Sequence, residues 1–149
     1  MYFETVTDLA EQAERLRVRR YGVIEVVGAR LRAVRLRPFP KLASLAGAAL
    51  LGHWFHERRL GDRCLLYYNQ PRRFPNFLAL QYLLSARRTR LATVLSALAV
   101  LDEIARLKRS EALLCDASNV RLSDRVLARY GWQPHCPSRW HRNFIKRLG

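Results

Sequence analysis

The sequence has few acidic side chains and no long apolar segment. Only 12 of its 149 residues are Asp or Glu, against 27 Lys and Arg, so the formal net charge is +15. The longest weakly polar stretch, from Leu42 to Phe55, spans about 14 residues, fewer than the roughly 20 of a membrane-spanning helix. We therefore expect no membrane span, although flanking Lys41, Arg58 and Arg59 leave an interfacial helix on anionic lipid open. With 50% hydrophobic residues, the chain can form one compact domain over residues 1 to 149.

Cysteine is also scarce. The three cysteines, Cys64, Cys115 and Cys136, are an odd number at wide spacing, and the first residues show no signal-peptide pattern. This favours reduced thiols and a cytoplasmic protein. The set Cys115, His135, Cys136 and His141 lacks a paired Cys-x-x-Cys, so we expect no metal site. The neighbours His135 and Cys136 are equally poor as a nucleophile and base, because adjacent residues rarely point into one site.

Arginine is the residue in excess, since 24 of the 27 basic residues are Arg and only 3 are Lys. Arg binds phosphate bidentately and stacks on bases, which indicates a nucleic-acid or other polyanionic partner. The arginines are scattered along the whole chain, so a general preference for arginine explains them equally well. The tail after Ser138 interleaves Arg139 and Arg142 with Trp140 and Phe144, as sites for single-stranded nucleic acid do. The same tail can instead form a last strand whose aromatic side chains pack into the domain.

Hydrophobic periodicity predicts the elements of the first half. Residues 3 to 20 have a helical pattern with acids early and arginines late, an order that the helix dipole favours. Residues 23 to 36 contain two alternating runs around Gly28 and Ala29, which predicts a hairpin. An Ala- and Leu-rich helix follows over residues 42 to 58. Two further apolar runs predict strands over residues 64 to 68 and 77 to 84.

The second half has the stronger patterns. Apolar residues recur at helical spacing from Leu91 to Leu107, and the continuous apolar run from Ala112 to Cys115 predicts a central strand. Ser123 is expected to cap a short helix that stops at Gly131, before a short strand over residues 132 to 135. Residues 79 to 135 are therefore predicted to form a strand, helix, strand, helix, strand unit of an α/β domain.

This unit, with a basic turn before its long helix and the sequence Arg-Tyr-Gly-Trp after its second helix, resembles the Gcn5-related N-acetyltransferases, or GNAT family. The resemblance is strongest over residues 79 to 135. It implies a single-domain α/β fold with a mixed central sheet, helices on both faces and a sheet that splays where the cofactor enters. It also implies acetyl-CoA or another acyl-CoA as cofactor and N-acyl transfer to an unknown acceptor.

In that family a turn of the form Gln or Arg, two residues, Gly, one residue, Gly or Ala holds the cofactor's pyrophosphate on backbone amides at a helix N-terminus. The corresponding residues here are Arg87, Arg88, Thr89, Arg90, Leu91 and Ala92. Arg90 replaces the central glycine, which normally lets the backbone approach the phosphates. The turn is therefore either a CoA site in which Arg90 supplies charge or a basic helix-entry turn. The resemblance also implies a cofactor contact from Asn119.

The resemblance implies attack by a deprotonated amine on the thioester carbonyl, with a backbone amide near Leu83 or Leu84 holding the oxyanion. Leu127 replaces the tyrosine that commonly protonates the leaving thiolate. For the base, the strand-end Asp116 is the best candidate, ahead of Glu57 and Asp62 near another turn, although a strand-end Asp can equally be a turn residue. Tyr130 is a candidate for proton transfer that can equally be a packed aromatic. Two functions stay open: an acyl-CoA-dependent N-acyltransferase, active or degenerate, and a non-enzymatic basic module that binds nucleic acid or another polyanion.

Overall fold

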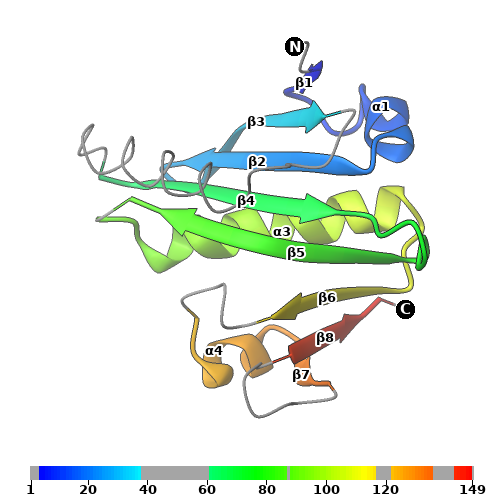
Figure 1. Cartoon of the computed structure of the whole chain (residues 1–149). Coiled ribbons are helices and arrows are strands. Elements are labelled where there is room, and N and C mark those ends of the chain that lie inside the picture. Colours follow the sequence, from blue (N-terminus) through cyan, green and yellow to red (C-terminus); the bar gives the residue numbers. More distant parts are fainter. Residues whose placement is uncertain (1–3, 38–60, 87, 117–121, 136–142, 149) are drawn as a thin grey trace.

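The computed structural model describes residues 4–37, 61–86, 88–116, 122–135 and 143–148. In this part of the chain, eight strands form one sheet in the order β1-β3-β2-β4-β5-β6-β8-β7 (Figure 1). The strands are β1 (Glu4–Val6), β2 (Tyr21–Val27), β3 (Arg30–Arg37), β4 (Arg63–Asn69), β5 (Phe77–Ser85), β6 (Ala112–Asp116), β7 (Gln133–Pro134) and β8 (Asn143–Arg147). The described helices are α1 (Ala13–Val18), α3 (Leu91–Leu107) and α4 (Asp124–Arg129). Among these described strands, only β5 and β6 pair in parallel, so the predicted α/β fold with a mixed sheet is confirmed.

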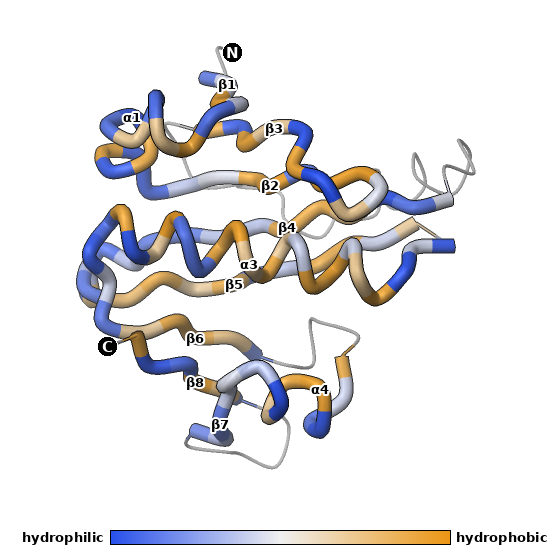
Figure 2. The backbone as a smooth tube through the Cα atoms, turned by 180° about the vertical axis from the view of Figure 1, so that it is seen from behind, coloured by the Kyte–Doolittle hydropathy of each residue, from blue (hydrophilic) through white to orange (hydrophobic). Residues whose placement is uncertain are grey.

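The unit predicted over residues 79 to 135 is present as β5, α3, β6, α4 and β7. Helix α3 has the predicted bounds and lies across one face of the sheet, as seen from behind in Figure 2. The Ser123 hydroxyl caps α4 as expected, accepting a hydrogen bond from the Val126 amide at 3.2 Å. The described part of the basic tail forms strand β8 between β6 and β7, which confirms its interpretation as a last strand.

The helix predicted over residues 3 to 20 was wrong in its first part. Strand β1 instead pairs with β3 at the edge of the sheet, and α1 begins only afterwards. The Asp8 carboxylate causes the break, because its Oδ1 accepts hydrogen bonds from the amides of Ala10 (2.9 Å) and Glu11 (3.0 Å). Such a local side-chain turn competes with helix formation. The helix predicted over residues 42 to 58 lies outside the described residues.

The three described helices all contribute to one large core. Leu16 of α1, Leu101 of α3 and Leu127 of α4 belong to the same buried cluster, together with alternate residues of the central strands. A smaller cluster on other strand positions contains Val23, Leu65, Tyr67 and Ala86. Because neighbouring residues of a strand point to opposite faces, the second cluster lies on the face of the sheet away from α3.

The parallel strands β5 and β6 separate partway along their length. Their pairing runs from Phe77 with Ala112 to Leu80 with Cys115. Beyond Leu80, β5 continues to Ser85 with β4 as its sole partner among the described residues. The two strands therefore form a fork that opens toward their carboxyl ends, visible in Figure 1 as the divergence of β5 from β6.

A β-bulge lies at the point where the fork begins. The successive β4 residues Tyr67 and Tyr68 pair with Tyr82 and Leu80, so Gln81 is an extra residue in β5. A bulge bends its strand and increases the local twist, which explains why β5 turns away from β6 here. It also inverts the alternation of side chains along β5. The sheet therefore splays between these strands, as the family resemblance implied.

Tyr68 provides a test of the main core. Its side chain is 1% exposed and its hydroxyl has no hydrogen-bond partner among the described residues. Burial also raises the pKa of Tyr68, because the phenolate would lose its hydration. We expect Tyr68→Phe to raise the free energy of unfolding by about 1 kcal/mol, since it removes an unsatisfied polar group. Urea unfolding measures this change, and Tyr130→Phe at an exposed position is a neutral control. A loss of stability in Tyr68→Phe would contradict the conclusion that the Tyr68 hydroxyl is buried without a hydrogen-bond partner in the described part of the chain.

Candidate functional site

A cavity of about 240 Å³ lies where the fork begins. Its lining residues come from β5, β6 and β8 and from the residue that follows β7. They are Ala79, Leu80, Leu114, Cys115, Asp116, His135, Asn143 and Phe144. The cavity therefore lies beside the strand positions at which β5 and β6 stop pairing.

Strand register places several lining residues on one face of the sheet. Asp116 pairs directly with Asn143, and Leu114, two residues earlier in β6, pairs with Ala79. Directly paired residues share a face, as do residues two apart in one strand. Cys115 belongs to the opposite face and to the core that includes α3. The polar end of the cavity therefore lies on the face away from α3.

Three polar residues, Asp116, His135 and Asn143, meet at this cavity. The His135 amide donates a hydrogen bond to the Asn143 carbonyl oxygen at 2.9 Å, which fixes His135 beside the start of β8. A carboxylate and an imidazole are the residue types that most often act as general bases in enzymes. Sequence reasoning selected Asp116 but considered His135 only as a metal ligand or as a partner of Cys136. The signal for His135 was its place at a strand end next to the last strand.

Tyr130 lies apart from the cavity. It is the C-cap residue of α4, its side chain is 42% exposed, and it does not line the cavity. Leu127, at the position of the family's tyrosine, is buried in the core. None of the described residues that line the cavity carries a hydroxyl group. The proposed proton transfer by Tyr130 remains a prediction, and the structure gives α4 no hydroxyl at the cavity.

The predicted cofactor contacts are divided between two places. Leu83 and Leu84 lie on the part of β5 that has separated from β6. The Leu83 side chain belongs to the main core, and the Leu84 side chain packs against the smaller cluster. Arg88, Leu91 and Ala92 are exposed at the start of α3. Arg87 and Asn119 lie outside the described residues. Their roles in cofactor binding stay predictions.

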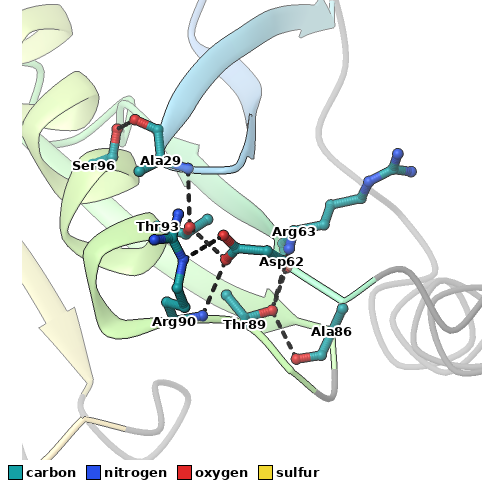
Figure 3. A network of polar contacts seen from close by, with 8 residues as sticks. All are labelled: Ala29, Asp62, Arg63, Ala86, Thr89, Arg90, Thr93 and Ser96. Atoms are coloured by element: carbon teal, nitrogen blue, oxygen red, sulfur yellow. Dashed lines mark hydrogen bonds and ion pairs between the residues drawn. The ribbon is translucent and has the colours of Figure 1, made fainter.

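The first turn of α3 already holds a carboxylate of the same chain (Figure 3). Asp62 Oδ1 accepts hydrogen bonds from the Arg90 amide at 3.0 Å and from Thr93 Oγ1 at 2.5 Å. Its Oδ2 accepts from Arg90 Nε at 2.7 Å. The Thr93 hydroxyl, followed by the two Arg90 donors, holds the pKa of Asp62 below its usual value. Since a helix N-terminus attracts anions, Asp62 takes the position that an anionic ligand would need.

Neighbouring segments fix this arrangement (Figure 3). Thr93 Oγ1 accepts a hydrogen bond from the Ala29 amide, and Ser96 Oγ donates to the Ala29 carbonyl oxygen, both at 3.0 Å. The Thr89 hydroxyl lies 2.8 Å from the Arg63 carbonyl oxygen. The β2–β3 turn and the start of β4 are therefore both attached to the start of α3. We call the contacts of Asp62 with Arg90 and Thr93 the Asp62 cap.

Other site classes find little support in the described part of the chain. No group of three or more His, Cys, Asp and Glu side chains there could hold a metal ion. Burial raises the pKa of the Cys64 thiol to about 12, so this cysteine is protonated and unreactive at neutral pH. No helix in the described ranges is both long and apolar enough to cross a membrane.

No protein-family model and no curated protein sequence matches the chain. Among solved structures, it is similar to a protein from Desulfovibrio desulfuricans assigned to the GNAT family of acetyltransferases, with a TM-score of 0.44, 17% identity, and coverage of 74% of this chain and 82% of that one. It is also similar to nourseothricin acetyltransferase, with a TM-score of 0.41, 13% identity and coverage of 100% of both chains.

Proposed function

We propose that the protein is a degenerate relative of the acyl-CoA-dependent N-acyltransferases, which binds an acyl thioester at the fork of its sheet. The observation that carries this proposal is the separation of β5 from β6 after Leu80, directly beside the cavity. The pantetheine arm of acyl-CoA is extended and contains two amides, so it can pair with an unpaired strand edge as an added strand does. The thioester end would then reach the cavity.

The Asp62 cap argues against a pyrophosphate at the start of α3. A phosphate brought there would meet the Asp62 carboxylate, whose lowered pKa keeps it charged at neutral pH. The Arg90 guanidinium and amide that could bind the phosphate already donate to Asp62. The arm of acyl-CoA therefore fits the fork, but its pyrophosphate does not fit the capped helix.

A bound acyl thioester supplies an activated acyl group for an amine. Asp116 and His135 are the groups at the cavity that can take a proton from that amine. Because the described lining residues include no hydroxyl, the thiolate would leave without the general acid that the family commonly uses. A candidate base without a general acid supports weak or absent turnover.

A titration with S-acetyl-pantetheine, which has the arm and thioester but no nucleotide, tests the proposal. We expect Ala79→Phe to weaken binding at least about tenfold, since a phenyl ring would fill the cavity beside the fork. Isothermal titration calorimetry measures the affinity. Ala99→Phe, on the exposed side of α3, is the matched control and should leave the affinity unchanged.

Thermal unfolding of both variants shows whether each remains folded. The proposal is rejected if the wild-type protein does not bind S-acetyl-pantetheine, or if a folded Ala79→Phe variant binds it as tightly as the wild type. Release of free thiol in the presence of amines would show that catalysis persists, and would overturn the degenerate assignment while leaving the binding site in place.

A further inference from the structure

The end of the molecule opposite the Asp62 cap contains a second cluster of charged side chains. There the end of α1, the end of α3 and the loop between β4 and β5 lie together, on the right of Figure 1. Lys108 joins them, because its Nζ donates hydrogen bonds to the Arg17 carbonyl oxygen at 2.9 Å and to Gln70 Oε1 at 3.0 Å. The Gln70 amide in turn donates to the Arg20 carbonyl oxygen at 2.7 Å. Three separate segments thus form one surface.

Positive charge exceeds negative charge at this end, where the nearby acids are Glu14 and Glu111, whose Oε2 accepts a hydrogen bond from Asn76 Nδ2 of the loop at 2.9 Å. Arg17 pairs with Glu14 at 3.1 Å, but within the described ranges neither Arg20 nor Lys108 forms an ion pair with an acid. The Nη1 atom of Arg20 is also buried without a hydrogen-bond partner among the described residues. Burial and the charge of Arg20 lower the pKa of Lys108 to about 8. An anion bound at the surface beside Arg20 and Lys108 would offset the repulsion between these two cations.

The loop between β4 and β5 adds two cations and an aromatic ring to the same surface. Arg72 and Arg73 are exposed, and the Phe74 side chain is 55% exposed. Gln70 Nε2 donates to the Pro75 carbonyl oxygen at 2.6 Å, so the residue that contacts Lys108 also closes the loop. In the described part of the chain, neither Arg72 nor Arg73 has an acidic partner.

We propose that this basic end, formed by Arg20, Arg72, Arg73, Phe74 and Lys108, binds single-stranded nucleic acid. Arginines and lysine contact successive phosphates, and the exposed phenyl ring provides a stacking surface for a base. The site is separate from the fork and does not depend on acyl-thioester binding. An anionic membrane is a poorer partner, because a membrane-surface helix presents a continuous apolar face, whereas this loop exposes one phenyl ring between Pro71 and Pro75.

Fluorescence anisotropy with a labelled oligouridylate, measured over a range of salt concentrations, tests the proposal. We expect the Arg72→Gln, Arg73→Gln double variant to bind about tenfold more weakly at low salt and to reduce the slope of log K against log salt by about 1.4, for two lost phosphate contacts. The matched control is Arg125→Gln, Arg129→Gln, which removes two exposed arginines from α4. Phe74→Ser should weaken binding without changing the salt slope.

The control variant distinguishes a site from general attraction by a chain with a net charge of +15. Equal weakening in both double variants would overturn the proposal, and so would absence of oligouridylate binding by the wild-type protein. Binding to phosphatidylserine vesicles that exceeds binding to oligouridylate, and that is lost in Phe74→Ser, would assign the surface to membranes instead. Inorganic phosphate should raise the melting temperature of the wild type and not that of Lys108→Gln. An equal rise in both would show that Lys108 does not contribute to phosphate binding.

Discussion

Glu25→Ala is expected to lower the free energy of unfolding by about 3 kcal/mol. Glu25 lies within β2 and is 3% exposed. Its Oε1 lies 2.7 Å from Arg35 Nη1, and its Oε2 lies 3.9 Å from Nη1 of both Arg32 and Arg63. Removal of the carboxylate takes this counter-charge away from Arg63, whose side chain is 11% exposed. The expected value is at the lower end of the stability loss usually caused by breaking a buried ion pair, because water can solvate the more exposed Arg32 and Arg35.

Two further variants separate burial from charge. Glu25→Gln keeps the size of the side chain and a hydrogen-bond acceptor for Arg35, so it should cost less than Glu25→Ala. Glu4 forms a short surface pair with Arg19 at 2.6 Å, and Glu4→Ala should have little effect because water replaces the partner. Chemical denaturation measures the free energy of unfolding of Glu25→Ala, Glu25→Gln and Glu4→Ala. Similar losses for Glu4→Ala and Glu25→Ala would contradict the importance of burial.

Asp62→Ala is expected to tighten the binding of acetyl-CoA by about tenfold. The substitution removes a negative charge from the start of α3 and releases the Arg90 amide and guanidinium, which can then bind a phosphate. The affinity for S-acetyl-pantetheine should not change, because this ligand has no pyrophosphate to place at α3. Asp62→Asn removes the charge but keeps the shape, so its gain should be smaller than that of Asp62→Ala. Calorimetric titration of each variant with both ligands makes the comparison.

The pH dependence of stability provides a control that needs no ligand. Because the pKa of Asp62 is lowered in the folded state, its stabilising effect is present above the ordinary pKa of aspartate. It is lost as the pH falls through the lower folded-state value. The stability difference between the wild type and Asp62→Asn should therefore shrink in acid. A difference that stays constant would mean that the carboxylate does not form the Asp62 cap.

The elements that sequence patterns predicted well are those determined locally. Helix α3 has many apolar residues at helical spacing, and α4 has a serine cap, so both were found with their starts correct. The prediction of a helix from residue 3 was wrong in its first part because Asp8 forms a local turn, which hydrophobic periodicity does not detect. The bulge in β5 did leave a trace in the sequence. Leu78, Leu80 and Leu83 break the alternation of a strand at Gln81, the residue at which the fork begins.

The candidate sites depended on contacts between distant residues. Asp62 and Arg90 are 28 positions apart, and no local pattern indicates that one carboxylate will cap a helix so far along the chain. His135 reaches the cavity because β8 is inserted between β6 and β7, which places it beside Asn143. Sequence reasoning did identify the turn at residues 87 to 92 as the place where the family pattern changes. In the structure, Arg90 of this turn contacts Asp62 and so belongs to the Asp62 cap.

We propose that the fork holds a thioester arm while the Asp62 cap closes the phosphate site. The most direct test of this proposal is the ratio of two dissociation constants of the wild-type protein, for S-acetyl-pantetheine and for acetyl-CoA, measured in the same buffer. We predict a ratio of about one, because the nucleotide gains no contact at α3, and a rise to about ten in Asp62→Ala. Acetyl-CoA binding far more tightly than S-acetyl-pantetheine to the wild type, with no change in Asp62→Ala, would contradict the account.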